Sequence, residues 1–187
     1  MAKSNSKEQW IETGYNVFAK EGLQGIRIEA LARILGLNKS SFYYFFGDLE
    51  NYKAELVRYH FTRADDLVSD ISSCENFDPD FLNMLIRHKV TVIVHMQLVM
   101  HRTTPLFFNA FEKVNKVVDP KAMPYWAAFI GIPHNTELAL QYWQVIRDMF
   151  YSRISFDNLT YSFLQTLAQE ARGIAQKMLQ ENIFPDN

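Results

Sequence analysis

Residues 28–46 read IEALARILGLNKSSFYYFF, and this stretch decides the fold. Its first half carries apolar residues at helical spacing as far as Gly36: Ile28, Leu31, Ala32 and Leu35. Asn38 is a favourable N-cap for a second short helix over residues 39–46. Glycine adopts the left-handed conformation that swings one helix across another, so the turn Gly36-Leu37-Asn38 predicts a helix-turn-helix.

The second short helix divides into an apolar face and a polar face. Phe42, Phe45 and Phe46 are expected to pack on Leu31, Leu35 and Leu37, which leaves Lys39, Ser40, Tyr43 and Tyr44 outward and Ser41 at the edge. Recognition helices present first-turn side chains to base edges and phosphates, and tyrosine hydroxyls suit phosphate oxygens. A plain helical hairpin has the same spacing, so the pattern alone leaves both interpretations open.

The flanking residues predict a small N-terminal domain on a larger helical body. An apolar stripe over residues 6–20 predicts a supporting helix that ends near Gly22. Asp48 is expected to cap a helix reaching residue 71. Five of the seven glycines lie in the first 47 residues and all six prolines lie at or after Pro79. We therefore expect a helix-turn-helix domain over 1–47 and a larger helical domain over 48–187, with 48–71 as the connecting helix.

Three segments between residues 10 and 52 resemble the N-terminal domain of the TetR (tetracycline repressor) family. They are FAKEG at 18–22, Ile28 with Leu31-Ala32, and above all GLNKSSFYYFF at 36–46. The resemblance implies an all-α protein in which a three-helix DNA-binding domain joins a larger helical domain. It also implies a homodimeric transcriptional regulator, a ligand-responsive repressor in the first instance, that binds a palindromic operator in double-stranded DNA.

Matched position by position, the resemblance implies six DNA-binding residues: Arg27, Lys39, Ser40, Ser41, Tyr43 and Tyr44. Three positions depart from the family pattern. Ile26 stands where a helix-capping threonine is usual, Ser40 replaces a common glycine, and Leu49 replaces a frequent phosphate-binding lysine. The loss of that lysine predicts a salt dependence of binding that is weaker by about one unit of slope per subunit.

The C-terminal body is expected to hold helices over 79–102, 105–118, 123–130 and 136–151. In the family this region contains an inducer pocket, which implies a small and largely apolar ligand. Methionine and aromatic rings make adaptable pocket walls, with one histidine as a polar anchor or simply a buried polar side chain. The predicted pocket residues are His95, Met96, Met100, Phe107, Tyr125, Trp126 and Trp143.

The last two helices, 136–151 and about 158–181, are apolar over a wide arc. One chain covers only one side of such helices, whereas a two-fold four-helix interface would cover both. A fully intramolecular core is the alternative. The predicted interface residues are Leu138, Tyr142, Val145, Met149, Phe163, Leu167, Ala168, Ile174, Ala175 and Met178.

Composition and motifs exclude several other classes of protein. Six basic and four acidic residues precede Asp48, a net charge of +2 that leaves −4 for the rest, so a small DNA-binding head is permitted but not demanded. The apolar runs are too short for a membrane span, and the single Cys74 fits a reducing cytoplasm.

No cofactor or catalytic motif is found, so we expect no enzyme. His88 and His95 are two helical turns apart, about 10 Å, which argues against a shared metal. A ligand-binding or adaptor protein that kept the fold but lost DNA binding is the alternative function.

Overall fold

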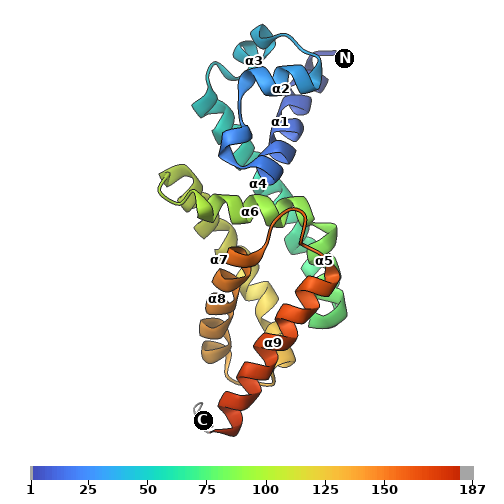
Figure 1. Ribbon diagram of the computed structural model, residues 1–187, viewed down its shortest axis with the longest axis vertical. Helices are drawn as coiled ribbons and strands as arrows, with labels where there is room; N and C mark the ends of the chain where they lie inside the picture. The colour runs from blue at the N-terminus through green and yellow to red at the C-terminus, as the bar shows by residue number, and fades with distance from the viewer. Residues whose placement is uncertain (1, 182–187) are drawn as a thin grey trace. The chain divides into compact units, whose positions relative to one another are not determined.

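The computed structural model describes residues 2–181, with side chains described from Ser6 onward. The described residues form α-helices joined by turns and short 3-10 and π segments, with no strand among them (Figure 1). The predicted all-α class is therefore confirmed.

The helices of the N-terminal half lie close to their predicted bounds. The elements are α1 (Ala2–Glu21), the 3-10 turn η1 (Leu23–Gly25), α2 (Ile28–Leu35), α3 (Lys39–Phe46) and α4 (Leu49–Ile71). The first is longer than the predicted 6–20, while α2 and α3 match the prediction. Figure 1 shows α1, α2 and α3 packed together.

The C-terminal half departs from prediction in two places. Its elements are η2 (Phe77–Phe81), α5 (Leu82–Arg87), α6 (Lys89–Met100), α7 (Pro105–Ile130), α8 (Thr136–Arg153) and α9 (Tyr161–Gln180). The single helix predicted over 79–102 is interrupted at His88, whose φ of −94° and ψ of 22° leave the helical region. The two segments predicted at 105–118 and 123–130 are one helix, α7, which continues through Pro120 and Pro124.

The reason for the second difference is packing. Proline in a helix interior removes a backbone hydrogen bond and costs about 3 kcal/mol. Around these prolines, however, α7 buries Ala122, Met123 and Trp126, each at most 7% exposed. Apolar burial of this extent overrides local helix propensity, which is only a weak predictor.

The chain folds as two compact units. The first comprises residues up to 65 together with 90–114, and the second comprises 66–89 together with the residues from 115 on. The predicted domain limit lay between residues 47 and 48, whereas residues 48–65 and 90–114 pack with the N-terminal helices. The core of the first unit includes the fully buried side chains of Trp10, Leu31, Phe42, Tyr52, Ile93 and Leu98.

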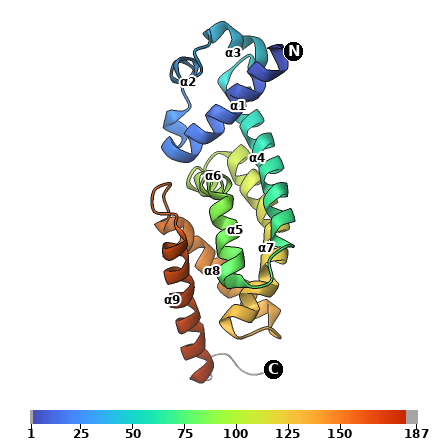
Figure 2. The ribbon, with the colours of Figure 1, turned by 90° about the vertical axis from the view of Figure 1, so that its right-hand side faces the viewer.

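The second unit is held by aromatic rings and by a partly buried ion pair. Trp126 lies at the centre, with ring centroids 5.3 Å from Phe77 and 5.6 Å from Trp143. Asp119 accepts a hydrogen bond of 2.9 Å from the indole N–H of Trp143 and pairs with the Arg147 guanidinium. Within this unit α9 contacts α5 (Figure 2).

Candidate nucleic-acid interface

Backbone geometry at both ends of the α2–α3 turn fixes the start of α3. Gly36 follows α2 in the left-handed conformation, with φ of 64°, and nothing lies within 4 Å of the position that a Cβ would take. Asn38 then caps α3, because its Oδ1 accepts a hydrogen bond of 3.0 Å from the backbone N–H of Ser40. Both predicted roles, the glycine turn and the asparagine cap, are confirmed.

The inner face of α3 rests on an aromatic base. Phe42 is fully buried and meets the rings of Trp10 and Tyr52 edge-on, at centroid distances of 5.3 and 5.0 Å. Phe46 packs on Tyr52 at 4.8 Å. Phe45, predicted to face inward with them, is only half-buried. Edge-to-face aromatic pairs add about 0.5–1.5 kcal/mol each beyond area burial, so this base holds α3 firmly.

The outer face of α3 is polar and accessible. Lys39 and Ser40 in its first turn are exposed, and Tyr43 and Tyr44 are 52% and 69% exposed. Arg27 is also exposed, at the N-cap of α2. Lys39 Nζ lies 3.1 Å from Glu29 Oε1, so the first turns of α2 and α3 are neighbours. Five of the six predicted DNA-binding residues thus lie on exposed positions of α3 or the start of α2.

Ser41, the sixth of these residues, is placed differently. Its Oγ accepts a hydrogen bond of 3.3 Å from the indole N–H of the buried Trp10 and donates one of 2.7 Å to the carbonyl oxygen of Asn38. The hydroxyl is therefore engaged within the protein, where it fastens α3 to α1. The sequence places Ser41 at the edge between the two faces but gives no sign of the distant indole.

The electrostatics of this surface are balanced rather than strongly basic. The backbone N–H of Glu29 and the Lys39 ammonium beside it lower the pKa of the Glu29 carboxyl, which keeps it ionised. An exposed pair of this kind contributes little to stability. If Lys39 contacted a phosphate or a base, its ammonium would give up the Glu29 carboxylate for that group.

The three departures from the family pattern have clear structural consequences. Ile26 is 3% exposed and fills the core, and α2 begins without a side-chain cap at Arg27. Leu49 is half-buried at the start of α4, which is capped by Asp48 through a 2.7 Å hydrogen bond from the Asn51 N–H. Ser40 is exposed on the outer face of α3.

The predicted pocket residues are divided between the two units. His95, Met96, Met100 and Phe107 belong to the first unit, whereas Tyr125, Trp126 and Trp143 belong to the second. Met100 is 65% exposed, whereas Trp126 is 1% exposed inside the aromatic cluster.

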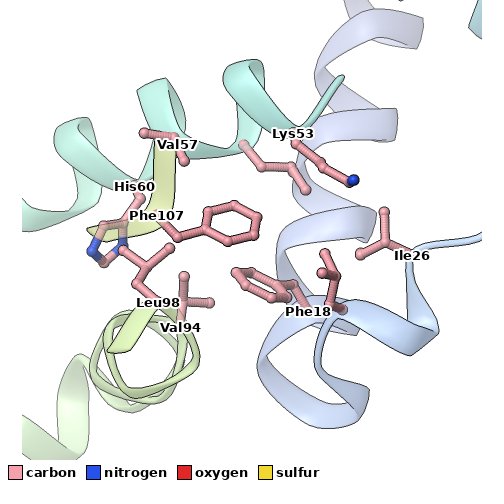
Figure 3. A pocket seen from close by; sticks show the side chains of 10 residues that line it. Phe18, Ile26, Lys53, Val57, His60, Val94, Leu98 and Phe107 are labelled. Atoms are coloured by element: carbon pink, nitrogen blue, oxygen red, sulfur yellow. The ribbon is translucent and has the colours of Figure 1, made fainter. Parts of the chain in front are cut away.

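The first unit contains a cavity of about 10 Å³, lined by Phe18, Leu23, Ile26, Lys53, Leu56, Val57, His60, Val94, Leu98 and Phe107 (Figure 3). Of the predicted pocket residues, Phe107 lines it. A volume of this size holds about one water molecule, whereas ligand pockets span about 300–1,000 Å³.

The predicted dimer face divides into accessible and buried residues. Val145 and Ile174 are 65% and 45% exposed, and Leu138, Tyr142, Met149, Phe163 and Met178 are half-buried. Leu167, Ala168 and Ala175 are instead buried within the protomer. These three side chains belong to the inward side of α9, where the Tyr142 hydroxyl donates a 2.7 Å hydrogen bond to the Ala171 carbonyl oxygen.

Sequence reasoning missed one buried polar group in the first unit. The Tyr15 hydroxyl lies 2.8 Å from His60 Nδ1, and His60 Nε2 lies 3.2 Å from His95 Nδ1. His60 shares the buried stripe of α4 with Tyr52, Leu56 and Ala64. A histidine at such a stripe position is the signal that could have found it.

Two further properties concern the whole described part of the chain. Its histidine, cysteine, aspartate and glutamate side chains do not gather in groups of three or more that could hold a metal ion. None of the helices that the structure describes combines the length and apolar character needed to cross a membrane.

A scan against protein-family models and a search of curated proteins found no match for this chain. The resemblance to the TetR family therefore remains a prediction from the sequence.

Proposed function

We propose that this protein is a cytoplasmic transcriptional regulator of the TetR type, which binds double-stranded DNA as a homodimer and is not an enzyme. One observation carries the proposal. The polar face of α3 is exposed through Lys39, Ser40, Tyr43 and Tyr44, while its opposite face is locked onto Trp10 and Tyr52. A rigid helix with an accessible first turn is the form in which recognition helices meet the major groove.

The contacts divide by chemistry. Lys39 and Ser40 are proposed to read base edges, since the ammonium donates to guanine acceptors and the hydroxyl both donates and accepts. Tyr43, Tyr44 and Arg27 are proposed to hold phosphate oxygens, which positions the helix without reading sequence. Ser41 is left out of this set because its hydroxyl is bonded to Trp10.

The proposed dimer uses the accessible part of α8 and α9. Val145 and Ile174 are large apolar side chains in an exposed position, flanked by half-buried Leu138, Met149 and Met178. A second copy related by a two-fold axis would cover this face. Two recognition helices held about 34–36 Å apart would then read the half-sites of a palindrome.

Response to a small, largely apolar ligand is part of the proposal and rests on the resemblance. Trp126 and Trp143 are the predicted pocket residues that lie together, with ring centroids 5.6 Å apart. Because Trp126 is 1% exposed, a ligand that reaches these rings must repack them. Repression by operator occupancy, relieved by the ligand, is the proposed mode of action.

The test is binding of the full chain to fluorescent duplexes from the DNA upstream of its own gene, followed by anisotropy at low salt. The wild type is expected to bind one fragment, Lys39→Ala and Tyr43→Ala to bind it at least several-fold more weakly, and the control Lys121→Ala to bind it like wild type. Lys121 is an exposed lysine of α7, remote in sequence from α3.

The alternative function, a ligand-binding or adaptor protein without DNA binding, has support from the surface of α2 and α3. Lys39 is paired with Glu29, and Leu49 stands in place of a cation. The absence of binding to any upstream fragment at low salt, with no effect of either α3 variant, would favour this alternative and refute the regulator.

A further inference from the structure

A buried chain of hydrogen bonds joins three helices inside the first unit. It begins with the Tyr15 hydroxyl of α1, passes through both ring nitrogens of His60 in α4, and ends at Nδ1 of His95 in α6, with distances of 2.8 and 3.2 Å. Thr91, one turn before His95, also hydrogen-bonds to the Tyr15 hydroxyl. His60 is completely buried, and the other three side chains are at most 6% exposed.

The proton count of this chain is fixed by its geometry. A neutral imidazole has one N–H and one bare nitrogen, so each bond along the chain contains one hydrogen. If the Tyr15 hydroxyl donates to His60 Nδ1, then His60 Nε2–H donates to His95 Nδ1, and the reverse order works equally well. A proton on each ring would place two N–H groups head to head across 3.2 Å and break the bond between His60 and His95.

A single added proton on His60 is unfavourable as well, because both of its ring nitrogens already face neutral hydrogen-bond partners in a fully buried site. Aromatic and cationic groups lie around the chain. Tyr59 of α4 meets the Tyr15 ring at 5.0 Å, Arg63 of α4 acts on the Tyr15 hydroxyl, and Phe111 of α7 stacks on His95 at 4.8 Å. Burial, followed by the neighbouring His95, lowers the pKa of His60 well below its ordinary value.

Lys53 lines the cavity beside His60, and a further histidine contacts Phe18 in the cavity wall. Lys53 of α4 lines the cavity together with His60 and pairs with Glu50 at the surface (Figure 3). His101, which follows α6, stacks on Phe18 at a centroid distance of 6.4 Å. Neither neighbour supplies a negative charge to an imidazolium at His60.

We propose that the Tyr15–His60–His95 chain is a proton-sensitive latch, which holds α1 on α4 and α6 while both histidines are neutral and releases α1 when the pair takes up a proton. Release of α1 would also loosen α3, because Trp10 of α1 donates a hydrogen bond to Ser41 and packs on Phe42. The consequence for DNA binding rests on the proposed function, whereas the latch itself does not.

The sign of the effect follows from proton linkage. His60 binds a proton readily in the unfolded chain, below about pH 6.5, and poorly in the folded chain. The stability contributed by the neutral His60 is therefore complete above that pH and declines as the pH falls toward the depressed folded value. One histidine of this kind lowers the folding equilibrium constant by about tenfold between pH 7.5 and 5.5.

The first test is urea denaturation of the full chain at pH 7.5 and 5.5. The variants are His60→Gln, which cannot take up the proton, and His134→Gln as a control at an exposed histidine. The folding equilibrium constant of wild type and of His134→Gln should fall about tenfold more on acidification than that of His60→Gln. An equal fall in all three proteins would overturn the latch.

Two further measurements keep the test decisive. If His60→Gln does not fold, NMR titration of the histidine rings in the wild type replaces it. Burial lowers the pKa of His60, so its ring should take up a proton only well below the ordinary range and together with a change in the indole signal of Trp10 in α1. Protonation of His60 with an unchanged Trp10 signal would overturn the proposal.

In DNA-binding assays at constant ionic strength, acidification into the range where the histidine pair takes up a proton should weaken binding by wild type at least several-fold but not binding by His60→Gln. Equal binding by wild type above and within that range would refute the latch and leave the regulator intact. Absence of binding at every pH, with the stability result as expected, would refute the regulator alone.

Discussion

Gly14 of α1 is the position at which a single methyl group should disturb the aromatic base beneath α3. A Cβ added there would lie 1.8 Å from Tyr52 Oη and 2.8 Å from Tyr52 Cζ. The Tyr52 hydroxyl cannot easily withdraw, because it donates a 2.6 Å hydrogen bond to the carbonyl oxygen of Trp10 and its ring is fully buried. Gly14→Ala must therefore displace the ring on which Phe42 and Phe46 rest.

The expected loss of stability combines three effects. Overpacking of a core costs about 1–3 kcal/mol, and loss of a buried hydrogen bond costs about 1 kcal/mol more. Alanine in a helix interior returns about 1 kcal/mol relative to glycine. The free energy of unfolding of Gly14→Ala should thus fall by about 1–3 kcal/mol, a sizeable part of the 5–15 kcal/mol that is usual for a domain.

Urea denaturation followed by circular dichroism measures this change, and Gly173→Ala in α9 is the matched control. Nothing lies within 4 Å of a Cβ at Gly173, so the same substitution there should raise the free energy of unfolding by up to about 1 kcal/mol. Tyr52→Phe alone should lower the free energy of unfolding by about 1 kcal/mol. In the Gly14→Ala background it should lower it no further, because it removes the hydroxyl oxygen that lies closest to the added Cβ. Equal effects of the two glycine substitutions, or additive effects of Gly14→Ala and Tyr52→Phe, would refute the reasoning.

Three other substitutions probe separate parts of the molecule. Ser41→Ala leaves the buried indole N–H of Trp10 without this acceptor and should lower the free energy of unfolding by about 1–2 kcal/mol in urea titrations. An unchanged urea midpoint would show that the hydrogen bond from Trp10 to Ser41 does not stabilise the fold. Val145→Glu on α8 should convert a dimer into monomers in sedimentation experiments, whereas Val117→Glu on α7, at a similarly exposed valine, should leave the dimer intact. Asp119→Ala removes a partly buried carboxylate that binds both the Trp143 indole N–H and the Arg147 guanidinium, and should lower the free energy of unfolding by about 1–3 kcal/mol in thermal or urea unfolding. An unchanged free energy of unfolding would show that this carboxylate does not stabilise the second unit.

The local structure around α3 was predictable because short-range signals agree there. Glycine at the end of α2, asparagine at the start of α3 and the spacing of the phenylalanines all act within a few residues, and each predicts the same bounds. The exposed positions of Lys39, Ser40, Tyr43 and Tyr44 follow directly from that helix.

Features that depend on distant residues were not predictable from one sequence. The bond from Trp10 to Ser41 spans 31 positions, and the contact of His60 with His95 spans 35. The helix through Pro120 and Pro124 illustrates the same limit, since tertiary burial outweighs a strong local preference. The wide apolar arc of α9 was predictable, but the side of it that the protomer itself covers was not, because helical periodicity identifies an apolar face and not the element that packs on it.

The most direct test of the central proposal, that the outer face of α3 and Arg27 at the N-cap of α2 bind DNA, is the salt dependence of binding to the upstream fragment. The logarithm of the binding constant of wild type should fall linearly with the logarithm of the salt concentration. Arg27→Gln removes the cation proposed to hold a phosphate and should reduce the slope by about 0.9 for each subunit on the DNA, and Lys121→Gln should leave it unchanged. A wild type that does not bind at the lowest salt, or an Arg27→Gln line that coincides with that of wild type, would contradict the account.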